Sequence, residues 1–188
     1  MQLIWEGKLV RLRPFRSADE LYNLLEELTL EPDEFWGYGW WIRQRITAEF
    51  ESNGRIGTTT TWSIFAVDRI DTGELVGYEV VWLPAPQQID CEVGTVILQR
   101  HWSNGFGREA KLLAMCFLFE NYPLERVSAT TMDKHLRARA GLEACGMQLD
   151  GTWRGAAFSM GKRAGIVRYG IFREQWEKLP VRRSLKRG

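Results

Sequence analysis

A glycine-containing segment that joins an apolar run to a helical pattern is the part of this sequence best suited to carry chemistry. Val96–Leu98 is apolar, and Asn104-Gly105-Phe106-Gly107 follows at the start of a predicted helix. The first turn of a helix presents backbone N–H groups without partners and the positive end of the helix dipole. Glycines let an anion approach those groups. The segment predicts a phosphate site with Asn104 as N-cap, although a tight structural turn would use the same glycines.

Two better-known phosphate-binding patterns do not fit this segment. The dinucleotide fingerprint needs a third glycine and an early strand-helix-strand unit near an acidic residue, and the P-loop needs Gly-Lys followed by Ser or Thr. Neither pattern is present. We therefore expect a phosphate cradle of another type.

Aromatic residues gather in a second segment, Phe35-Trp36-Gly37-Tyr38-Gly39-Trp40-Trp41. Glycines between aromatic rings allow the rings to approach a ligand from adaptable backbone. We expect Trp36, Tyr38 and Trp41 to contact a substrate, with Tyr78 as a further substrate contact from a neighbouring strand. A hydrophobic plug of the core is the alternative interpretation of the aromatic segment.

Hydrophobic periodicity predicts the elements that must position these segments. The pattern predicts strands at 8–14, 61–70, 75–83, 91–98, 124–131, 147–153 and 165–172, and helices at 18–30, 40–52, 104–121 and 135–145. Ser17 is expected to cap the first helix. This order predicts one domain over residues 1–188, of the α/β or α+β class, with a mixed, mostly antiparallel sheet flanked by helices. Residues from about 180 to 188 are expected to form a basic, solvated tail.

Composition excludes several classes of protein. The net charge is +1, which argues against nucleic acid as a partner, although contact of the basic tail with RNA is a remote alternative. Cys91, Cys116 and Cys145 show no metal-binding spacing, so we expect buried thiols and no metal. No apolar run reaches the length of a membrane span, and no leader pattern opens the chain. We expect a cytoplasmic protein, monomeric or homodimeric, without membrane contact.

Several sequence pieces together resemble the GNAT superfamily of acetyltransferases, and within it the RimJ/RimL-like branch. They are Leu9-Val10-Arg11-Leu12-Arg13-Pro14, Gly73-Glu74-Leu75-Val76-Gly77, Glu92-Val93-Gly94, Trp102-Ser103-Asn104-Gly105-Phe106-Gly107-Arg108-Glu109-Ala110, Leu124-Glu125-Arg126-Val127 and Gly141-Leu142-Glu143-Ala144-Cys145-Gly146-Met147. The resemblance spans nearly the whole chain. It implies that acetyl-CoA is the co-substrate and that an amine accepts the acetyl group.

The resemblance also assigns cofactor contacts. It implies that the CoA diphosphate binds the glycine loop and that the preceding strand pairs with the pantetheine arm. The expected cofactor residues are Ile97, Leu98, Gln99, Trp102, Ser103, Asn104, Gly105, Phe106, Gly107 and Arg108. Relatives carry Asn-x-x-Ser at the start of the later helix, where this chain has His135 and Ala138. Many also carry Gln or Arg three residues before the first loop glycine; Trp102 stands there, as is common in this branch.

Two residues are the candidates for proton transfer. Acylation requires a neutral amine, so a base is expected beside the thioester. Glu92 lies roughly 20 Å along the strand from Leu98, about the length of an extended pantetheine arm, and shares a face with Gly94. Glu79 and Tyr78 are reserves for this role. His135 titrates near neutrality and is expected either to protonate the departing thiolate or to hold a phosphate.

These observations predict an N-acetyltransferase that transfers acetyl directly to a protein or peptide N-terminus or to a small-molecule amine. The departures at His135 and Ala138 leave an alternative, a non-catalytic CoA-binding sensor or interaction module with the same fold. Turnover of acetyl-CoA with a panel of amines separates the two.

Overall fold

The computed structural model describes residues 5–31, 43–52, 63–82, 89–159 and 161–187. Strands in this part of the chain are β1 (Trp5–Glu6), β2 (Val10–Arg13), β3 (Ser63–Arg69), β4 (Leu75–Trp82), β5 (Asp90–Ile97), β6 (Arg126–Met132), β7 (Gln148–Ser159), β8 (Lys162–Phe172) and β9 (Lys186–Arg187). Helices are α1 (Ala18–Leu30), α2 (Arg43–Ser52), α3 (Phe106–Asn121), α4 (Leu136–Ala144) and α5 (Arg173–Lys178), with 3₁₀ turns at Gln99–His101 and Pro180–Ser184.

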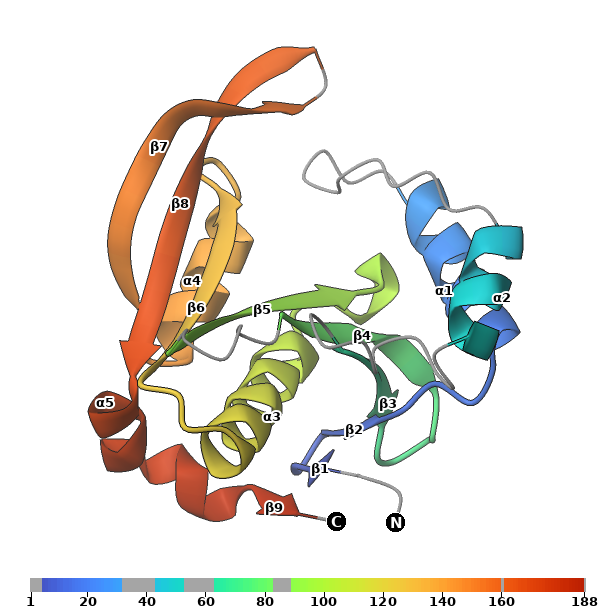
Figure 1. The fold of residues 1–188 in the computed structure, drawn as a ribbon, viewed down its shortest axis with the longest axis horizontal. Coiled ribbons are helices and arrows are strands. Elements are labelled where there is room, and N and C mark those ends of the chain that lie inside the picture. The colour runs from blue at the N-terminus through green and yellow to red at the C-terminus, as the bar shows by residue number, and fades with distance from the viewer. Residues whose placement is uncertain (1–4, 32–42, 53–62, 83–88, 160, 188) are drawn as a thin grey trace.

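The strands form one sheet in the order β7-β8-β6-β5-β4-β3-β2-β1-β9. Among the described strands, β5 and β6 pair in parallel and the other neighbours pair antiparallel. A mixed, mostly antiparallel sheet flanked by helices was predicted, and this prediction is confirmed. Figure 1 shows β7 and β8 rising at one end of the molecule and α1 and α2 lying at the other.

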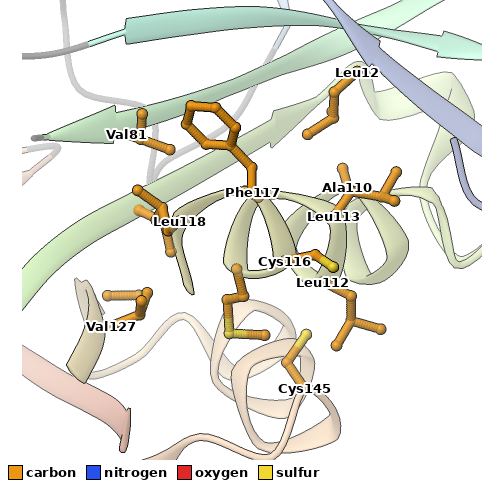
Figure 2. Close-up of a cluster of buried hydrophobic side chains, with 14 of the residues drawn as sticks. Leu12, Val81, Ala110, Leu112, Leu113, Cys116, Phe117, Leu118, Val127 and Cys145 are labelled. Atoms are coloured by element: carbon orange, nitrogen blue, oxygen red, sulfur yellow. The ribbon is translucent and has the colours of Figure 1, made fainter. Parts of the chain in front are cut away.

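Helix α3 packs on one face of the sheet and forms the centre of the larger core. Eleven of its residues are buried, which explains why its sequence is apolar nearly all round. Figure 2 shows Leu113 and Phe117 of α3 among side chains from the strands, such as Leu12 and Val81, with Cys145, which follows α4, close by.

Helix α1 covers the opposite face. Ser17 Oγ accepts a hydrogen bond from the N–H of Glu20, as the sequence predicts for an N-cap, and Leu21, Leu24, Leu25 and Leu28 are buried. These leucines form a second hydrophobic cluster with strand residues that include Tyr78 and Leu98. The sheet therefore has two buried faces, and α1 and α3 hold β4 and β5 between them.

The chain ends in elements that the sequence pattern did not predict. Helix α5 follows β8 directly, and its Trp176 is buried against Phe119 of α3. Pro180–Ser184 form a 3₁₀ turn and β9 pairs with β1. The three cysteines are free and buried, as predicted.

Candidate active site

Strands β5 and β6 separate after a short parallel contact. Their pairing covers Asp90 to Glu92 on β5 and Arg126 to Ser128 on β6. Beyond it, β5 continues to pair with β4 up to Ile97, and β6 pairs with β8 up to Met132. The carboxyl-terminal halves of two central strands thus diverge and leave backbone groups without a strand partner.

A cavity of about 470 Å³ lies at this divergence. Its walls come from β4, β5, β6, the start of α3 and the start of α4. The lining residues are Tyr78, Val80, Trp82, Val93, Gly94, Thr95, Val96, Ile97, His101, Trp102, Ser103, Gly105, Phe106, Gly107, Arg108, Lys111, Ala129, Thr130, Thr131, His135, Arg137, Ala138, Gly141 and Leu142. The cavity therefore joins the predicted glycine cradle to the strand that carries Glu92.

The cradle itself depends on two left-handed residues. Ser103 has φ 63° and Gly105 has φ 81°, and Gly105 is the N-cap of α3. A Cβ on Gly107 would lie 3.3 Å from Ile97 Cγ1, so helix and strand approach closely here. The first turn of α3 thus presents its N–H groups to the cavity wall.

The prediction that Asn104 caps α3 is wrong. The Asn104 side-chain amide donates hydrogen bonds to the carbonyls of His101 and Trp102, and Asn104 is not a lining residue. Its side chain closes the turn that precedes the helix. The left-handed conformation of Gly105 occupies the cap position instead, without a side-chain hydrogen bond.

The structure shows the hydrogen bonds of the strand residues that were expected to pair with the pantetheine arm. The Leu98 N–H donates to the Val76 carbonyl and the Gln99 N–H donates to Glu31 Oε1, while both carbonyls accept hydrogen bonds from the following turn. The N–H groups of Leu98 and Gln99 are therefore engaged within the protein, and each carbonyl already accepts one hydrogen bond. Backbone groups alternate along a strand, so Thr95 and Ile97 face away from β4, toward the divergence. Thr95 was not among the residues expected from the sequence.

The cavity wall is cationic. Arg108, Lys111 and Arg137 line it, and the described lining residues include no Asp or Glu. The Arg137 guanidinium lies 3.1 Å from the centroid of the Trp102 ring, so the start of α4 touches the loop before α3. The Trp102 Nε1–H donates to the Ile97 carbonyl over 2.7 Å and holds this ring in place. Cations around a helix N-terminus suit a ligand that carries phosphate.

Glu92 lies beside the cavity, where β5 and β6 part. Its carboxylate accepts a hydrogen bond from the hydroxyl of Thr130, which lines the cavity. Glu92 itself is half-buried and is not a lining residue. The Thr130 side chain therefore lies between the Glu92 carboxylate and a ligand that occupies the cavity near Gly94.

The reserve base Glu79 lies on the other face of the sheet. It is fully buried and its Oε1 lies 3.9 Å from the Lys111 Nζ. Burial raises the pKa of Glu79 to about 7, while Lys111 and Thr95 act in the opposite direction. Glu79 does not line the cavity, although Lys111 and Thr95, which act on its carboxylate, both do.

His135 and Tyr78 both line the cavity, in different settings. His135 is the N-cap of α4, and its Nδ1 accepts a hydrogen bond from the Ala138 N–H over 3.0 Å. This bond requires an unprotonated Nδ1, so a ring proton resides on Nε2. Tyr78 is 8% exposed, and burial together with the nearby Glu79 raises the pKa of its hydroxyl. The other expected substrate residues, Trp36, Tyr38 and Trp41, lie outside the described residues.

Several cavity residues were missed from the sequence. No sequence motif marks Trp82, Thr130 or Arg137. They come together at the cavity because of the pairing register of the sheet and the position of the start of α4. Trp82 could have been identified as the last residue of a strand that ends at Pro84. Arg137 could have been identified by its place in the first turn of the helix that follows His135.

Two structural findings bear on other sequence predictions. Among the described helices, none is both long and apolar enough to span a membrane. Within the described part of the chain, His, Cys, Asp and Glu side chains form no group of three that could hold a metal ion.

Comparisons with known proteins agree with this architecture. A family model described as an acetyltransferase (GNAT) domain matches residues 10–148. A GNAT-family acetyltransferase structure from Bacillus anthracis is 19% identical, has a TM-score of 0.73, and the match covers 93% of this chain and 99% of that one. No curated protein sequence gives a match.

Two further structures of similar fold carry CoA. The spermidine N-acetyltransferase of Vibrio cholerae, in complex with CoA and spermine, is 16% identical with a TM-score of 0.77, covering 90% of this chain and 98% of that one. RimL, the ribosomal L7/L12 alpha-N-protein acetyltransferase in complex with CoA, is 11% identical with a TM-score of 0.75, covering 88% and 95%.

The fold and the divided strands around the cavity define a GNAT domain. The chain belongs to the GNAT acetyltransferase family, because the family model covers residues 10–148 of its 188 residues.

Proposed function

We propose that this protein is an N-acetyltransferase that transfers acetyl from acetyl-CoA directly to an amine, in the cytoplasm. The observation that carries the proposal is the continuous cavity between the first turn of α3 and the region of Gly94 and Thr130. Family membership supports acetyl transfer in general. The named residues around the cavity support the particular roles given below.

The cofactor end of the cavity suits CoA. The N–H groups at the start of α3, at Phe106, Gly107 and Arg108, would hold the diphosphate, with Arg108 and Arg137 adding charge. The backbone of Thr95 and the N–H of Ile97 would pair with the pantetheine amides, as a strand would, while the Ile97 carbonyl accepts from Trp102 Nε1. This arrangement directs the thioester away from α3, toward Gly94.

Direct transfer is supported by the state of the thiols. Burial raises the pKa of Cys91 and Cys116 to about 12 and that of Cys145 to about 11. None of the three lines the cavity. The amine nitrogen would therefore attack the thioester carbon itself, so that the C–N bond forms, the C–S bond breaks and CoA leaves as a thiolate.

Glu92 is the proposed base, acting directly or through one water, with His135 Nε2–H as the proposed support for the departing thiolate. An α-amine has an ordinary pKa near 8 and a lysine near 10.4, so deprotonating lysine at pH 7 costs about 3 kcal/mol more. A single carboxylate base therefore favours a protein or peptide N-terminus, or another amine of low pKa. This choice agrees with the sequence resemblance to the RimJ/RimL-like branch.

A panel experiment tests the proposal. Purified protein is incubated with acetyl-CoA and with peptides, amino sugars and polyamines, and acetylated products are identified by mass spectrometry. We expect CoA release that depends on one class of amine. Tight CoA binding with no product from any amine would favour the alternative, a CoA-binding sensor.

A further inference from the structure

Trp82 and Glu92 stand directly opposite each other on β4 and β5. The antiparallel register pairs Trp82 with Glu92 and Val80 with Gly94, and directly opposed residues project from the same face. This is the face that α1 covers further along the strands, through Tyr78, Val96 and Leu98. An indole ring and a carboxylate are thus placed side by side next to the cavity.

The Trp82 ring extends over Gly94. A Cβ on Gly94 would lie 3.2 Å from Trp82 Cζ3 and 3.3 Å from Cη2, so the ring covers the place that a side chain would fill. Trp82 nevertheless remains 46% exposed and lines the cavity. A large aromatic ring held at an open cavity wall is available to contact a ligand.

The two carboxylates near the start of β5, those of Asp90 and Glu92, differ in their cationic partners. Asp90, two residues before Glu92, forms ion pairs with both Arg126 and Arg168. Glu92 accepts a hydrogen bond from Thr130, and among the described residues no cationic side chain pairs with it. An unneutralised carboxylate remains beside the exposed ring of Trp82.

A carboxylate next to an indole ring is an arrangement that attracts organic cations, through charge and through the quadrupole of the ring. Building on the proposed function, we propose that Trp82 and Glu92 together bind the acceptor as a protonated amine. Trp82 then selects acceptors that carry a positive charge at neutral pH. After binding, Glu92 takes the ammonium proton, directly or through one water, and the neutral nitrogen attacks the thioester.

A pair of small acceptors of similar shape tests the proposal. Benzylamine is a cation at pH 7, whereas aniline is neutral, and both present an aromatic ring to the site. The kcat/KM of each is measured at saturating acetyl-CoA for wild type, Trp82→Phe and Trp82→Leu. Contacts that Trp82 makes with the ring affect both acceptors, so the ratio of their kcat/KM values isolates recognition of charge.

We expect the benzylamine-to-aniline ratio to fall in the order Trp, Phe, Leu, by about twofold to thirtyfold for Trp82→Leu, the range of cation-to-ring attraction. An unchanged ratio in Trp82→Leu would overturn the proposal. Circular dichroism confirms folding of each variant, and Trp82→Phe keeps an aromatic ring if Trp82→Leu does not fold.

A binding measurement separates this proposal from the proposed reaction. Tetramethylammonium is titrated by calorimetry into the protein saturated with CoA, so that no turnover is needed. Binding to wild type that weakens in Trp82→Leu supports the cation site even if no amine is acetylated. Absence of tetramethylammonium binding to wild type, with CoA bound, would refute the cation site and leave the acetyltransferase proposal standing.

Discussion

The Glu79 carboxylate, buried between β4 and α3, lies 3.9 Å from the ammonium of Lys111, a residue that lines the cavity. Within the described part of the chain, neither Glu79 oxygen has a hydrogen-bond partner of ordinary geometry. Glu79 is fully buried, and burial is the first cause that raises its pKa to about 7. The folded protein therefore holds a proton on Glu79 at pH values where the unfolded chain releases it.

This relationship predicts that Glu79 lowers stability as pH rises. The folded pKa, about 7, lies above the ordinary value of 4.5, so the stabilising contribution is fully present below pH 4.5 and is lost as pH rises through about 7. The shift corresponds to about 3 kcal/mol. In urea unfolding, Glu79→Gln should lose less stability than wild type between pH 5 and pH 8, by about 2 kcal/mol.

The exposed Glu174 provides the matched control. Glu174→Gln makes the same chemical change on α5, and its stability should follow the wild-type pH dependence. A Glu79→Gln curve parallel to wild type would show that Glu79 is already ionised at pH 5. The ammonium of Lys111 would then dominate over burial.

Local sequence signals were sufficient for most of the fold. Ser17 and the leucines of α1 predicted that helix to the residue, because a cap and a periodic apolar stripe are both properties of adjacent positions. The turn before α3 was also predicted, since glycines mark it. The second strand of the last hairpin was placed well, but β7 continues to Ser159, beyond the predicted end at Trp153, through a segment that contains Gly155 and two alanines, residues of weak strand preference.

The site was harder to predict because it depends on long-range register. Trp82 and Glu92 lie opposite each other because β4 pairs with β5. The backbone of Thr95 faces the cavity because β6 stops pairing with β5 after Glu92. No spacing within one segment reports either fact. The hydrogen bonds that engage the N–H groups of Leu98 and Gln99 likewise depend on partners distant in sequence, Val76 and Glu31.

The second prediction concerns the cradle at the start of α3. Gly107→Asp places a negative charge and extra bulk beside the proposed diphosphate, whereas Gly107→Asn adds nearly the same bulk without charge. A Cβ there meets side-chain atoms, Ile97 Cγ1 at 3.3 Å and Thr95 Cγ2 at 3.8 Å, and no backbone atom within 4 Å, so both variants should fold. We expect calorimetry to show loss of acetyl-CoA binding for Gly107→Asp and a smaller loss for Gly107→Asn. If Gly107→Asp and Gly107→Asn bound acetyl-CoA with equal affinity, the diphosphate would lie elsewhere.

The third prediction concerns Glu109, which joins α3 to the start of β2. Its carboxylate accepts hydrogen bonds from the N–H groups of Lys8, Leu9 and Val10, at 2.9, 2.6 and 2.8 Å. Glu109→Gln keeps the shape of the side chain but replaces one acceptor oxygen by an NH₂ group, which faces the backbone N–H groups. Because two donors then oppose each other and the charge is lost, we expect the free energy of unfolding to fall by about 2 to 4 kcal/mol. The exposed Glu174→Gln should change stability by less than about 0.5 kcal/mol. A Glu109→Gln protein as stable as wild type would contradict this anchoring role.

The last prediction is that Glu92 removes the proton from the acceptor. Help from a general base is typically worth 10² to 10⁴ in rate, so kcat/KM of Glu92→Gln near pH 7 should fall by about that factor. The loss should shrink as pH rises, because at high pH the amine is already neutral and needs no base. A purely structural role would instead lower activity equally at every pH. Glu174→Gln makes the same change on α5, which does not line the cavity, and should keep the wild-type pH profile of kcat/KM. A Glu92→Gln profile parallel to wild type, or full activity at pH 7, would transfer the role to solvent.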